Sequence, residues 1–495
     1  MGLNRVWSKE QKVGPNSHVN EKGFDWLMGA VFVVGETAGG AMLALPNAMA
    51  AMGLVPGVAL IVLSAIICTY TGVQLAWTWK IMQNRWRDYR EHCRKPYGEM
   101  AYRTVGPRCR SFIAFMICVT QIGFACVLLL LAAKNLSIIL HYFVGLNINQ
   151  CYLIVIVGVL IWPMTMLKSP MHFWQVAIFS AGSSSLAVVL IVLGMMHDGP
   201  VCARDAPHDD SDFLSAAMAF GTIMFAYGGH ATLPTIQHDM MKPAHFVHSV
   251  VLSLSVCTLY YLAVGITGYF VYGSTVGEAV IPSIQIPWIQ QIVNLMVAVH
   301  VISTIVIVMS PPIQQVEQLL HIPHKFGVKR ILVRSTLFWL VVFLALSVPH
   351  FGPLLDLIGA STMVMMTILL PPIFYLSMRT QEIKWAANGT IEGGGDDEHE
   401  RATFKEIVQH TPKHILLFNA FILVFGIVGG TLATITSVIK LTQADMAPPC
   451  YVQYFSRGGL AFTDGDIGAV NCCGSLRNLT VGGQSPQGYC ALSEF

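Results

Sequence analysis

Residues 33–46 read Val-Val-Gly-Glu-Thr-Ala-Gly-Gly-Ala-Met-Leu-Ala-Leu-Pro, and this stretch decides the fold. It lies in an apolar segment from about Phe24 to Met52, which is long enough to cross a bilayer because a spanning helix needs about 20 residues. Its middle contains glycines and a carboxylate, which disfavour a continuous apolar helix. In lipid, a broken backbone is tolerated only where protein or a cavity surrounds it. The stretch therefore predicts a broken membrane helix at an enclosed site.

A second stretch, residues 225–234, has the same pattern and reads Phe-Ala-Tyr-Gly-Gly-His-Ala-Thr-Leu-Pro. In both stretches a Gly pair is followed shortly by Leu-Pro: Gly39-Gly40 by Leu45-Pro46, and Gly228-Gly229 by Leu233-Pro234. Two spans interrupted by Gly and Pro at corresponding places in two halves indicate the substrate site of a transporter.

The composition identifies a polytopic membrane protein. Of the 495 residues, 54% are hydrophobic and only 11% are charged, whereas a soluble domain carries roughly 25% charged residues. The net charge of +2 gives no reason to expect a nucleic-acid partner. The His, Cys and Asp positions show no metal-ligand spacing, and no Gly-x-x-x-x-Gly-Lys-Ser/Thr motif occurs, which favours a gradient-driven carrier over an ATP-driven pump.

We expect an all-α fold with eleven transmembrane helices. The expected spans cover residues 24–52, 54–79, 110–141, 150–167, 172–196, 213–237, 246–272, 287–320, 330–348, 351–378 and 413–440. The first 22 residues are polar and lack the apolar core of a signal peptide, so the N-terminus is expected in the cytosol. This orientation places most of the 29 Lys and Arg on the cytosolic side, as the positive-inside rule requires.

The two interrupted helices open two halves of five spans each. Because five is odd, the second half enters the membrane with the opposite orientation, which predicts an inverted repeat. The expected parts are a cytosolic segment 1–22 and a transporter domain 23–440, in which repeat one covers about 24–196, repeat two about 213–378 and an extra helix 413–440. The remaining residues, 441–495, form an extracellular or lumenal tail.

The tail is polar, Gly-rich and contains cysteines, as is typical of an oxidising compartment. Lipid attachment or free thiols are the alternatives for its cysteines. The disulfide candidates on the outer side are Cys151, Cys202, Cys450, Cys472, Cys473 and Cys490. Asn478 begins a glycosylation sequon in the tail, whereas the sequon at Asn388 lies in an expected cytosolic loop. The other six cysteines are expected to be free thiols.

At this point the residues resemble the amino acid/auxin permease family. Residues 35–48 are similar to the first-helix motif of that family, and residues 225–240 resemble its sixth-helix signature. Shorter likenesses lie before span 3 and at the end of span 8: Tyr97-Gly98, Gly106-Pro107, Pro311-Pro312, Gln314 and Glu317. The resemblance covers about residues 24–440 and implies a LeuT-like fold and secondary transport of amino acids, driven by protons or sodium. Glu36 departs from the family pattern, because many members carry a small or neutral residue there.

An amino acid is a zwitterion, so its site must hold a carboxylate and an ammonium away from bulk water. At a helix break, freed N–H groups suit the carboxylate and freed carbonyls suit an ammonium or a cation. Glycines let a substrate approach the backbone closely, although helix packing is an alternative role for them. The predicted substrate-binding residues are Gly35, Glu36, Thr37, Gly39, Gly40, Tyr227, Gly228 and Gly229.

The coupling ion is expected to be H⁺ or Na⁺, with no bound cofactor. A carboxyl in a water-poor cavity favours its protonated form, so Glu36 is a candidate proton site; an ammonium contact and a structural hydrogen bond are the alternatives. His230 and His300 are further candidates because imidazoles titrate near neutral pH, although both could be packing residues. Ser303 and Thr304, together with carbonyls of the first span, could form a cation site or simply cap their own helix.

The sequence therefore predicts a secondary active transporter of small or neutral amino acids, coupled to protons and working by alternating access. Sodium coupling is the first alternative, and an amino-acid-sensing receptor without net transport is an alternative of another class. No arrangement of nucleophile and base suggests an enzyme. The expected partners are an amino acid and the lipid bilayer of the plasma membrane or of an endolysosomal or vesicular membrane.

Overall fold

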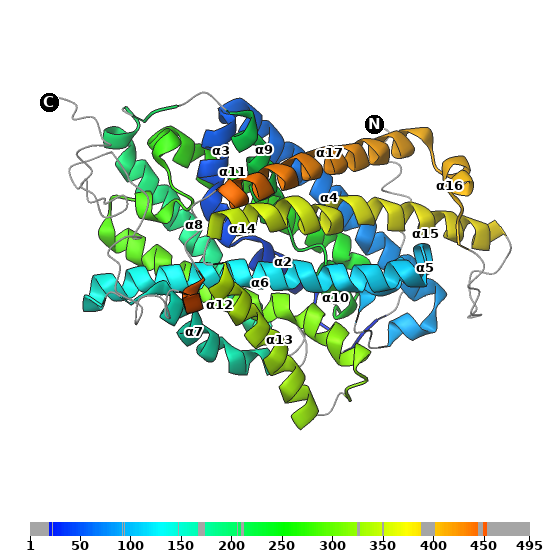
Figure 1. The fold of residues 1–495 in the computed structure, drawn as a ribbon. Coiled ribbons are helices and arrows are strands. Elements are labelled where there is room, and N and C mark those ends of the chain that lie inside the picture. Colours follow the sequence, from blue (N-terminus) through cyan, green and yellow to red (C-terminus); the bar gives the residue numbers. More distant parts are fainter. Residues whose placement is uncertain are drawn as a thin grey trace.

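The structure, a computed structural model, is all-helical in the part of the chain that it describes (Figure 1). The described residues are 19–21, 23–91, 93, 95–146, 148–166, 174–204, 206–208, 212–323, 327–348, 351–387, 401–443 and 449–452. Within them, the only β pairing outside helices is an isolated bridge between Phe24 and Met240.

Seven helices run unbroken for twenty residues or more: α4 (Leu54–Arg85), α6 (Pro107–Val144), α8 (Trp174–Cys202), α11 (Phe246–Tyr272), α12 (Pro287–Leu319), α13 (Val328–Ser347) and α17 (Lys413–Gln443). An eighth long helical stretch is composite: α14 (Phe351–Ile358), two π-helical turns η8 (Gly359–Met363) and η9 (Met365–Leu369), and α15 (Leu370–Ala387). Short elements outside these spans are η2 (Arg87–Arg90), α5 (Pro96–Thr104), η5 (Pro243–His245), η6 (Gly273–Thr275), η7 (Ile281–Ser283) and α16 (Phe404–His410).

Eight helices of the described chain are long and apolar enough to cross a bilayer, and a ninth is obtained if one bent pair counts as a single span. Shorter apolar helices, Gln150–Met166 and Phe213–Ala226, occupy the places of the predicted fourth and sixth spans. The chain is therefore an integral multi-pass membrane protein, whereas the count of eleven, the inverted repeat and the orientation of the termini stay predictions.

The first predicted break is present. Helix α2 (Trp26–Thr37) ends just before the Gly pair. The 3₁₀ turn η1 (Gly40–Ala44) and helix α3 (Leu45–Met52) follow, and this second part is bent by 47° relative to α2. Proline 46 suits the first turn of α3, because a helix leaves the N–H groups of that turn without partners.

The second predicted break separates α9 (Phe213–Ala226) from the short helix α10 (Leu233–His238). Gly229 has φ +130°, a backbone conformation that favours glycine. The N–H of Thr232 then closes the turn by donating to the Gly229 carbonyl at 3.0 Å.

Helix α12 forms the centre of the bundle, where it packs against α6 and α8 (Figure 1). In its most apolar stretch 72% of the residues are buried, against 22% for α17, which lies at the periphery. The first broken helix packs against α8 and α11, and α3 also contacts α9, so the two breaks are close together in the interior.

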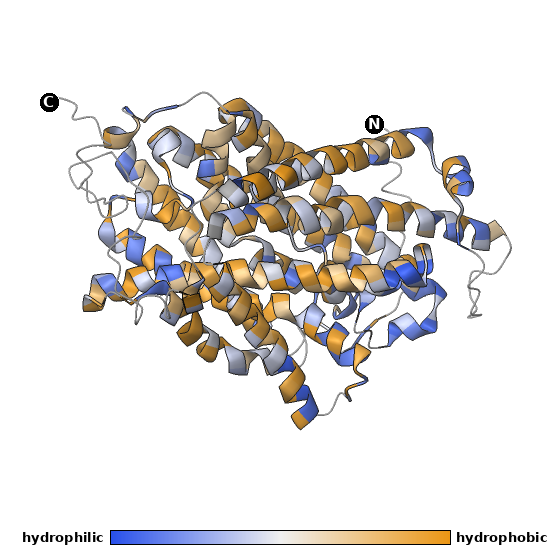
Figure 2. Cartoon of the chain, in the orientation of Figure 1, coloured by the Kyte–Doolittle hydropathy of each residue, from blue (hydrophilic) through white to orange (hydrophobic). Residues whose placement is uncertain are grey.

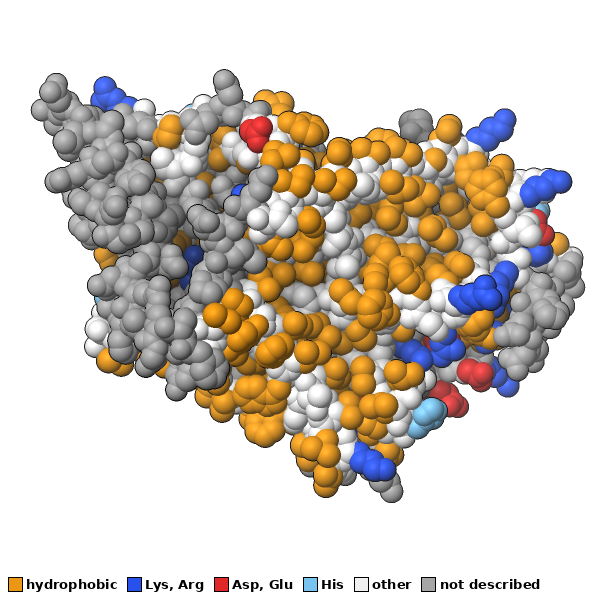
Figure 3. All heavy atoms as spheres, viewed as in Figure 1, with side chains coloured by type: hydrophobic (Ala, Val, Ile, Leu, Met, Phe, Trp, Pro, Cys, Tyr) orange, Lys and Arg blue, Asp and Glu red, His pale blue; other side chains and the backbone are white. Residues whose placement is uncertain are grey.

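The hydropathy of the residues differs between the long helices and one end of the molecule. Figure 2 shows hydrophobic colour along most of the long helices and hydrophilic colour around α5 and α16. On the face drawn in Figure 3, Lys and Arg gather at the end of the molecule where α5 and α16 lie. This end carries the loop between α4 and α6, which is rich in Lys and Arg and is therefore expected on the cytosolic side.

Cys151 and Cys450 form a disulfide with a Cα–Cα distance of 5.7 Å, which confirms two of the six predicted candidates. The bond fastens the segment after α17 to the start of α7 (Gln150–Ile161, continued by η3, Trp162–Met166). Tyr451 stacks on Phe343 of α13 beside it, with ring centroids 5.9 Å apart. Cys202 is disulfide-bonded as well.

The remaining predictions about cysteines and glycosylation divide into two groups. Cys472, Cys473, Cys490 and the sequon at Asn478 lie outside the described residues. The six cysteines expected to be free thiols are free: Cys68, Cys93, Cys109, Cys118, Cys126 and Cys257.

Replacing both Cys151 and Cys450 with Ser should lower the free energy of unfolding by about 2–4 kcal/mol, because the cross-link restricts the unfolded chain. Thermal unfolding of the purified protein measures this loss, and Cys109→Ser, at a free thiol that is only partly buried, is the control for the loss of a sulfur atom. An unchanged midpoint in the double variant would show that the bond contributes nothing to stability.

Candidate functional site

Glu36 and Thr232 connect the two breaks. Glu36 lies in the last turn of α2 and is only 1% exposed, and the Thr232 hydroxyl, at the start of α10, donates to Glu36 Oε2. The second oxygen, Oε1, has no hydrogen-bond partner among the described residues although it is buried. A buried carboxyl oxygen without a partner is unfavourable, so Oε1 is an acceptor that the described residues leave unpaired at the junction of the two broken helices.

The carbonyl oxygen of Gly35 is already bonded by hydroxyls from two neighbouring helices. Ser180 Oγ of α8 lies 2.5 Å from it, and Thr304 Oγ1 of α12 lies 3.0 Å from it. The two hydroxyl oxygens are 2.9 Å apart. Helix α2 is therefore tied to α8 and α12 through one carbonyl at its end.

His300 of α12 extends this polar cluster toward the first break. Its Nδ1 lies 2.6 Å from Ser184 Oγ and 3.0 Å from Ser180 Oγ, and its Nε2 lies 3.3 Å from Thr304 Oγ1. The imidazole also fills the space beside Gly39, where an added Cβ would overlap the ring. Ser303 is buried next to Thr304 but, among the described residues, it does not take part in this cluster.

Tyr261 of α11 bridges the two breaks from the opposite side. Its hydroxyl lies 2.8 Å from the Thr37 carbonyl oxygen and 2.6 Å from the Ala226 carbonyl oxygen. These carbonyls end α2 and α9, so the phenol, which has one proton to donate, lies within hydrogen-bond distance of the last turns of both broken helices. The freed carbonyls that the sequence suggested for an ammonium or a cation are thus largely occupied by side chains of the protein.

Two predicted residues of the second break are directed elsewhere. His230 Nε2 lies 2.9 Å from the Cys68 carbonyl oxygen and 3.2 Å from Thr71 Oγ1, both on α4. The Tyr227 hydroxyl lies 3.0 Å from Thr258 Oγ1 of α11. These contacts connect the second break to its neighbouring helices.

The glycines of both breaks are in close contact with protein. A Cβ on Gly40 would lie 2.7 Å from a methyl carbon of Leu131, and one on Gly228 would lie 2.8 Å from the sulfur of Met363. A Cβ on Gly229 would lie 3.3 Å from Thr37 Oγ1 and 3.7 Å from the Glu36 carboxyl carbon, which shows how closely the two breaks approach each other.

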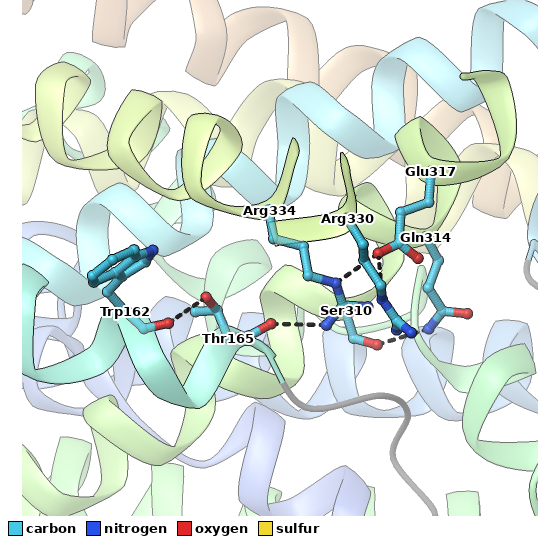
Figure 4. A network of polar contacts seen from close by, with 7 residues as sticks. All are labelled: Trp162, Thr165, Ser310, Gln314, Glu317, Arg330 and Arg334. Carbon is cyan, nitrogen blue, oxygen red and sulfur yellow. Dashed lines mark hydrogen bonds and ion pairs between the residues drawn. The ribbon is translucent and has the colours of Figure 1, made fainter. Parts of the chain in front are cut away.

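A second polar network fastens the far end of α12. Glu317 Oε1 accepts from Arg330 Nε at 3.0 Å and from Arg334 Nε at 2.6 Å, and all three side chains are buried (Figure 4). Arg334 also donates to the Thr165 carbonyl oxygen at 2.9 Å, which adds the end of α7. Because several charge-assisted bonds meet here, we expect α12, α13 and η3 to move as one body.

The sequence missed four residues of the site. Thr232 follows the second Gly pair closely, so a search for hydroxyls near the breaks would have found it. Ser180 and Ser184 lie in another apolar span, where Ser184 belongs to a run of three serines, and Tyr261 lies far from either motif. Their roles depend on helix packing, which the pattern of residues does not specify.

Comparison with known proteins identifies relatives over most of the chain. The model of a family described as "Transmembrane amino acid transporter protein" matches residues 22–393. Lysine histidine transporter-like 1 of Arabidopsis thaliana is 25% identical over 370 residues, which cover 71% of this chain and 80% of that protein. Amino acid transporter AVT1B of the same plant is 28% identical over 207 residues, but the match covers only 40% of this chain and 37% of that protein.

Two solved structures share the fold. The structure of MhsT in complex with L-phenylalanine has a TM-score of 0.55 at 11% identity and covers 86% of this chain and 100% of that one. Mhp1, a nucleobase-cation-symport-1 family transporter in a closed conformation with bromovinylhydantoin bound, has a TM-score of 0.57 at 12% identity and covers 89% and 98%. These likenesses show a LeuT-like fold and nothing about the substrate.

The contact between the two breaks predicts a matched pair of variants. Thr232→Val removes the hydroxyl that donates to Glu36 and leaves both carboxyl oxygens buried without it, which should cost about 1–3 kcal/mol in stability. Thr232→Ser keeps the donor and should stay close to the wild type. Thermal unfolding of the two purified variants measures the difference, and equal midpoints would contradict the bond.

Gly40→Val places a branched side chain against Leu131 in the first break and should abolish transport while the protein still reaches the membrane. Gly182→Val in α8 is the matched control, because no atom lies within 4 Å of a Cβ added at that glycine. Uptake normalised to surface expression tests the pair. Normal uptake by Gly40→Val would place the functional site away from this break.

Proposed function

Because the chain belongs to the transmembrane amino acid transporter family, we propose that it is a secondary active transporter that moves amino acids across a membrane by alternating access. The family consists of transporters, not enzymes. The observation that best supports the proposal is Glu36, a buried carboxylate with one free oxygen at the point where two broken helices meet. A buried ionisable group in a membrane protein indicates a binding or coupling site.

The enclosed geometry favours a small or neutral amino acid. Leu131 and Met363 stand directly against the Gly pairs, and Tyr227 is fully buried, so little space is open beside the breaks. The substrate would lie between Gly35–Gly40 and Tyr227–Gly229, with backbone N–H groups toward its carboxylate. The free oxygen of Glu36 is a suitable acceptor for its ammonium group.

Proton coupling is the favoured mechanism. A carboxyl that alternates between the two sides of the membrane, in surroundings that disfavour its charge, can load a proton on one side and release it on the other. Glu36 would carry this proton and hold the substrate, so each would influence the binding of the other. His300 and His230 are the next candidates, and of the two His300 contacts the first break.

Sodium coupling is the alternative, and one observation favours it. The oxygens of Gly35, Ser180 and Thr304 converge between three helices, and oxygen atoms are the ligands of hard cations. They are, however, in hydrogen-bond contact with one another, so the helices would have to separate before an ion could enter. For this reason we prefer the proton as the coupling ion.

Uptake into vesicles containing the purified protein tests the function. Each of the twenty amino acids is offered under an imposed proton gradient and then under a sodium gradient. Accumulation of at least one small or neutral amino acid, driven by protons and unaffected by replacing sodium, is the expected result. Saturable binding without accumulation would favour the receptor alternative, and strict dependence on sodium would favour the Ser180 and Thr304 cluster as the coupling site.

Glu36→Gln imitates a permanently protonated carboxyl. We expect it to weaken proton-driven accumulation by about tenfold or more, because an amide can neither bind nor release the coupled proton, while exchange of substrate across the membrane is largely retained. Glu278→Gln, at an exposed carboxylate, is the matched control. Undiminished proton-driven uptake in Glu36→Gln would exclude Glu36 as the proton site.

A further inference from the structure

A pocket of about 660 Å³ lies at the end of the molecule that carries α5, away from the helix breaks. Its walls come from the segment η2–α5, the first turn of α6 and the C-terminal end of α12. A volume of this size holds a small organic ligand. This is the end that the positive-inside rule assigns to the cytosol.

One wall of the pocket is a tyrosine surrounded by guanidinium groups. The ring of Tyr102 has the Cζ atoms of Arg103, Arg110 and Arg401 at 5.4, 5.3 and 5.8 Å from its centre. Each of the three stacks against this aromatic ring, which holds its position, and two of them, Arg103 and Arg110, also line the pocket. Three like charges around one ring repel one another, and a bound anion would relieve this repulsion.

Two further basic side chains line the same pocket. Lys95, which precedes α5, makes no ion pair within the described chain, and both its burial and the charge of Arg110 lower its pKa. His321, which lies in the turn after α12, is exposed and has φ +52°, and it is the only described residue other than glycine with a positive φ. This backbone turn places the imidazole at the pocket.

The acidic residues of the pocket neutralise only part of this charge. Glu99 accepts from Arg110 at 2.6 Å and from the Tyr89 hydroxyl at 3.3 Å, so its carboxylate is already engaged. Asp88 is exposed at the rim. Against these two carboxylates stand Lys95, Arg103 and Arg110, which leaves the pocket net positive, and His321 adds a further basic side chain.

We propose that this pocket binds a phosphate-bearing anion, with Lys95, Arg110 and His321 as its contacts. A single carboxylate would fill only a small part of the volume and neutralise one charge, whereas a phosphate ester carries about two charges and several acceptor oxygens. Two sources carry this group: the headgroup of a phosphoinositide in the adjacent leaflet, and a soluble phosphorylated metabolite. The site is separate from the transport pathway proposed above, so the two proposals can fail independently.

Binding to the full-length protein in phosphatidylcholine nanodiscs tests the site without any transport measurement. The soluble probes are pyrophosphate and inositol trisphosphate, and a second set of nanodiscs contains phosphatidylinositol bisphosphate. A saturable rise in the thermal midpoint is expected with at least one probe, because a ligand that binds only the folded state stabilises it. A response to the soluble probes identifies a soluble ligand, and a response confined to the lipid identifies a headgroup.

The double variant Lys95→Gln/His321→Asn removes the lysine and the imidazole that line the pocket, and asparagine tolerates the left-handed backbone at position 321. We expect it to bind at least about fivefold more weakly, since one lysine facing an anionic phosphate contributes about fivefold and the imidazole N–H adds a hydrogen-bond donor. Arg87→Gln/Lys405→Gln removes two exposed cations outside the pocket and should bind like the wild type. Equal affinity of the two double variants, or no binding of any probe by the wild type, would overturn the proposal.

Discussion

The backbone at the two helix breaks must form its hydrogen bonds without water, and the surrounding helices are arranged to supply them. The Gly35 carbonyl is bonded by hydroxyls of α8 and α12, and one phenol from α11 reaches the carbonyls that end α2 and α9. Carbonyl groups without hydrogen bonds are costly in a membrane interior, so the breaks are stable only where neighbouring side chains supply donors. A helix break is therefore also a point of attachment between the broken helix and its neighbours.

This arrangement bears on how such a protein could move. Glu36 at the end of α2 accepts a hydrogen bond from Thr232 at the start of α10, so the two broken helices contact each other directly. At the far end of α12, Glu317 and two arginines join α12, α13 and the end of α7. Some contacts thus join the broken helices to each other and others join α12, α13 and the end of α7, while Ser180, Thr304 and Tyr261 connect the broken helices to their neighbours.

The sequence predicted the positions of both breaks correctly because glycine and proline act locally. Gly39-Gly40 and Gly228-Gly229 lie where the helices end, since a residue at φ +130° such as Gly229 is costly for any other amino acid. The sequence did not predict Ser180 or Tyr261, because their contribution depends on which face of another helix meets the break. The sequence made His230 and His300 equal candidates for proton coupling, whereas in the structure only the His300 ring lies against the first break.

The disulfide between Cys151 and Cys450 joins residues that are 299 positions apart. Synthesis proceeds at about 5–20 residues per second, so the Cys151 thiol waits roughly 15–60 seconds before its partner leaves the ribosome. During that time the Cys151 thiol cannot form its native bond. A chain that stops before Cys450 can never form it, and thiol-directed quality control would then have a chemical difference by which to distinguish truncated molecules from complete ones.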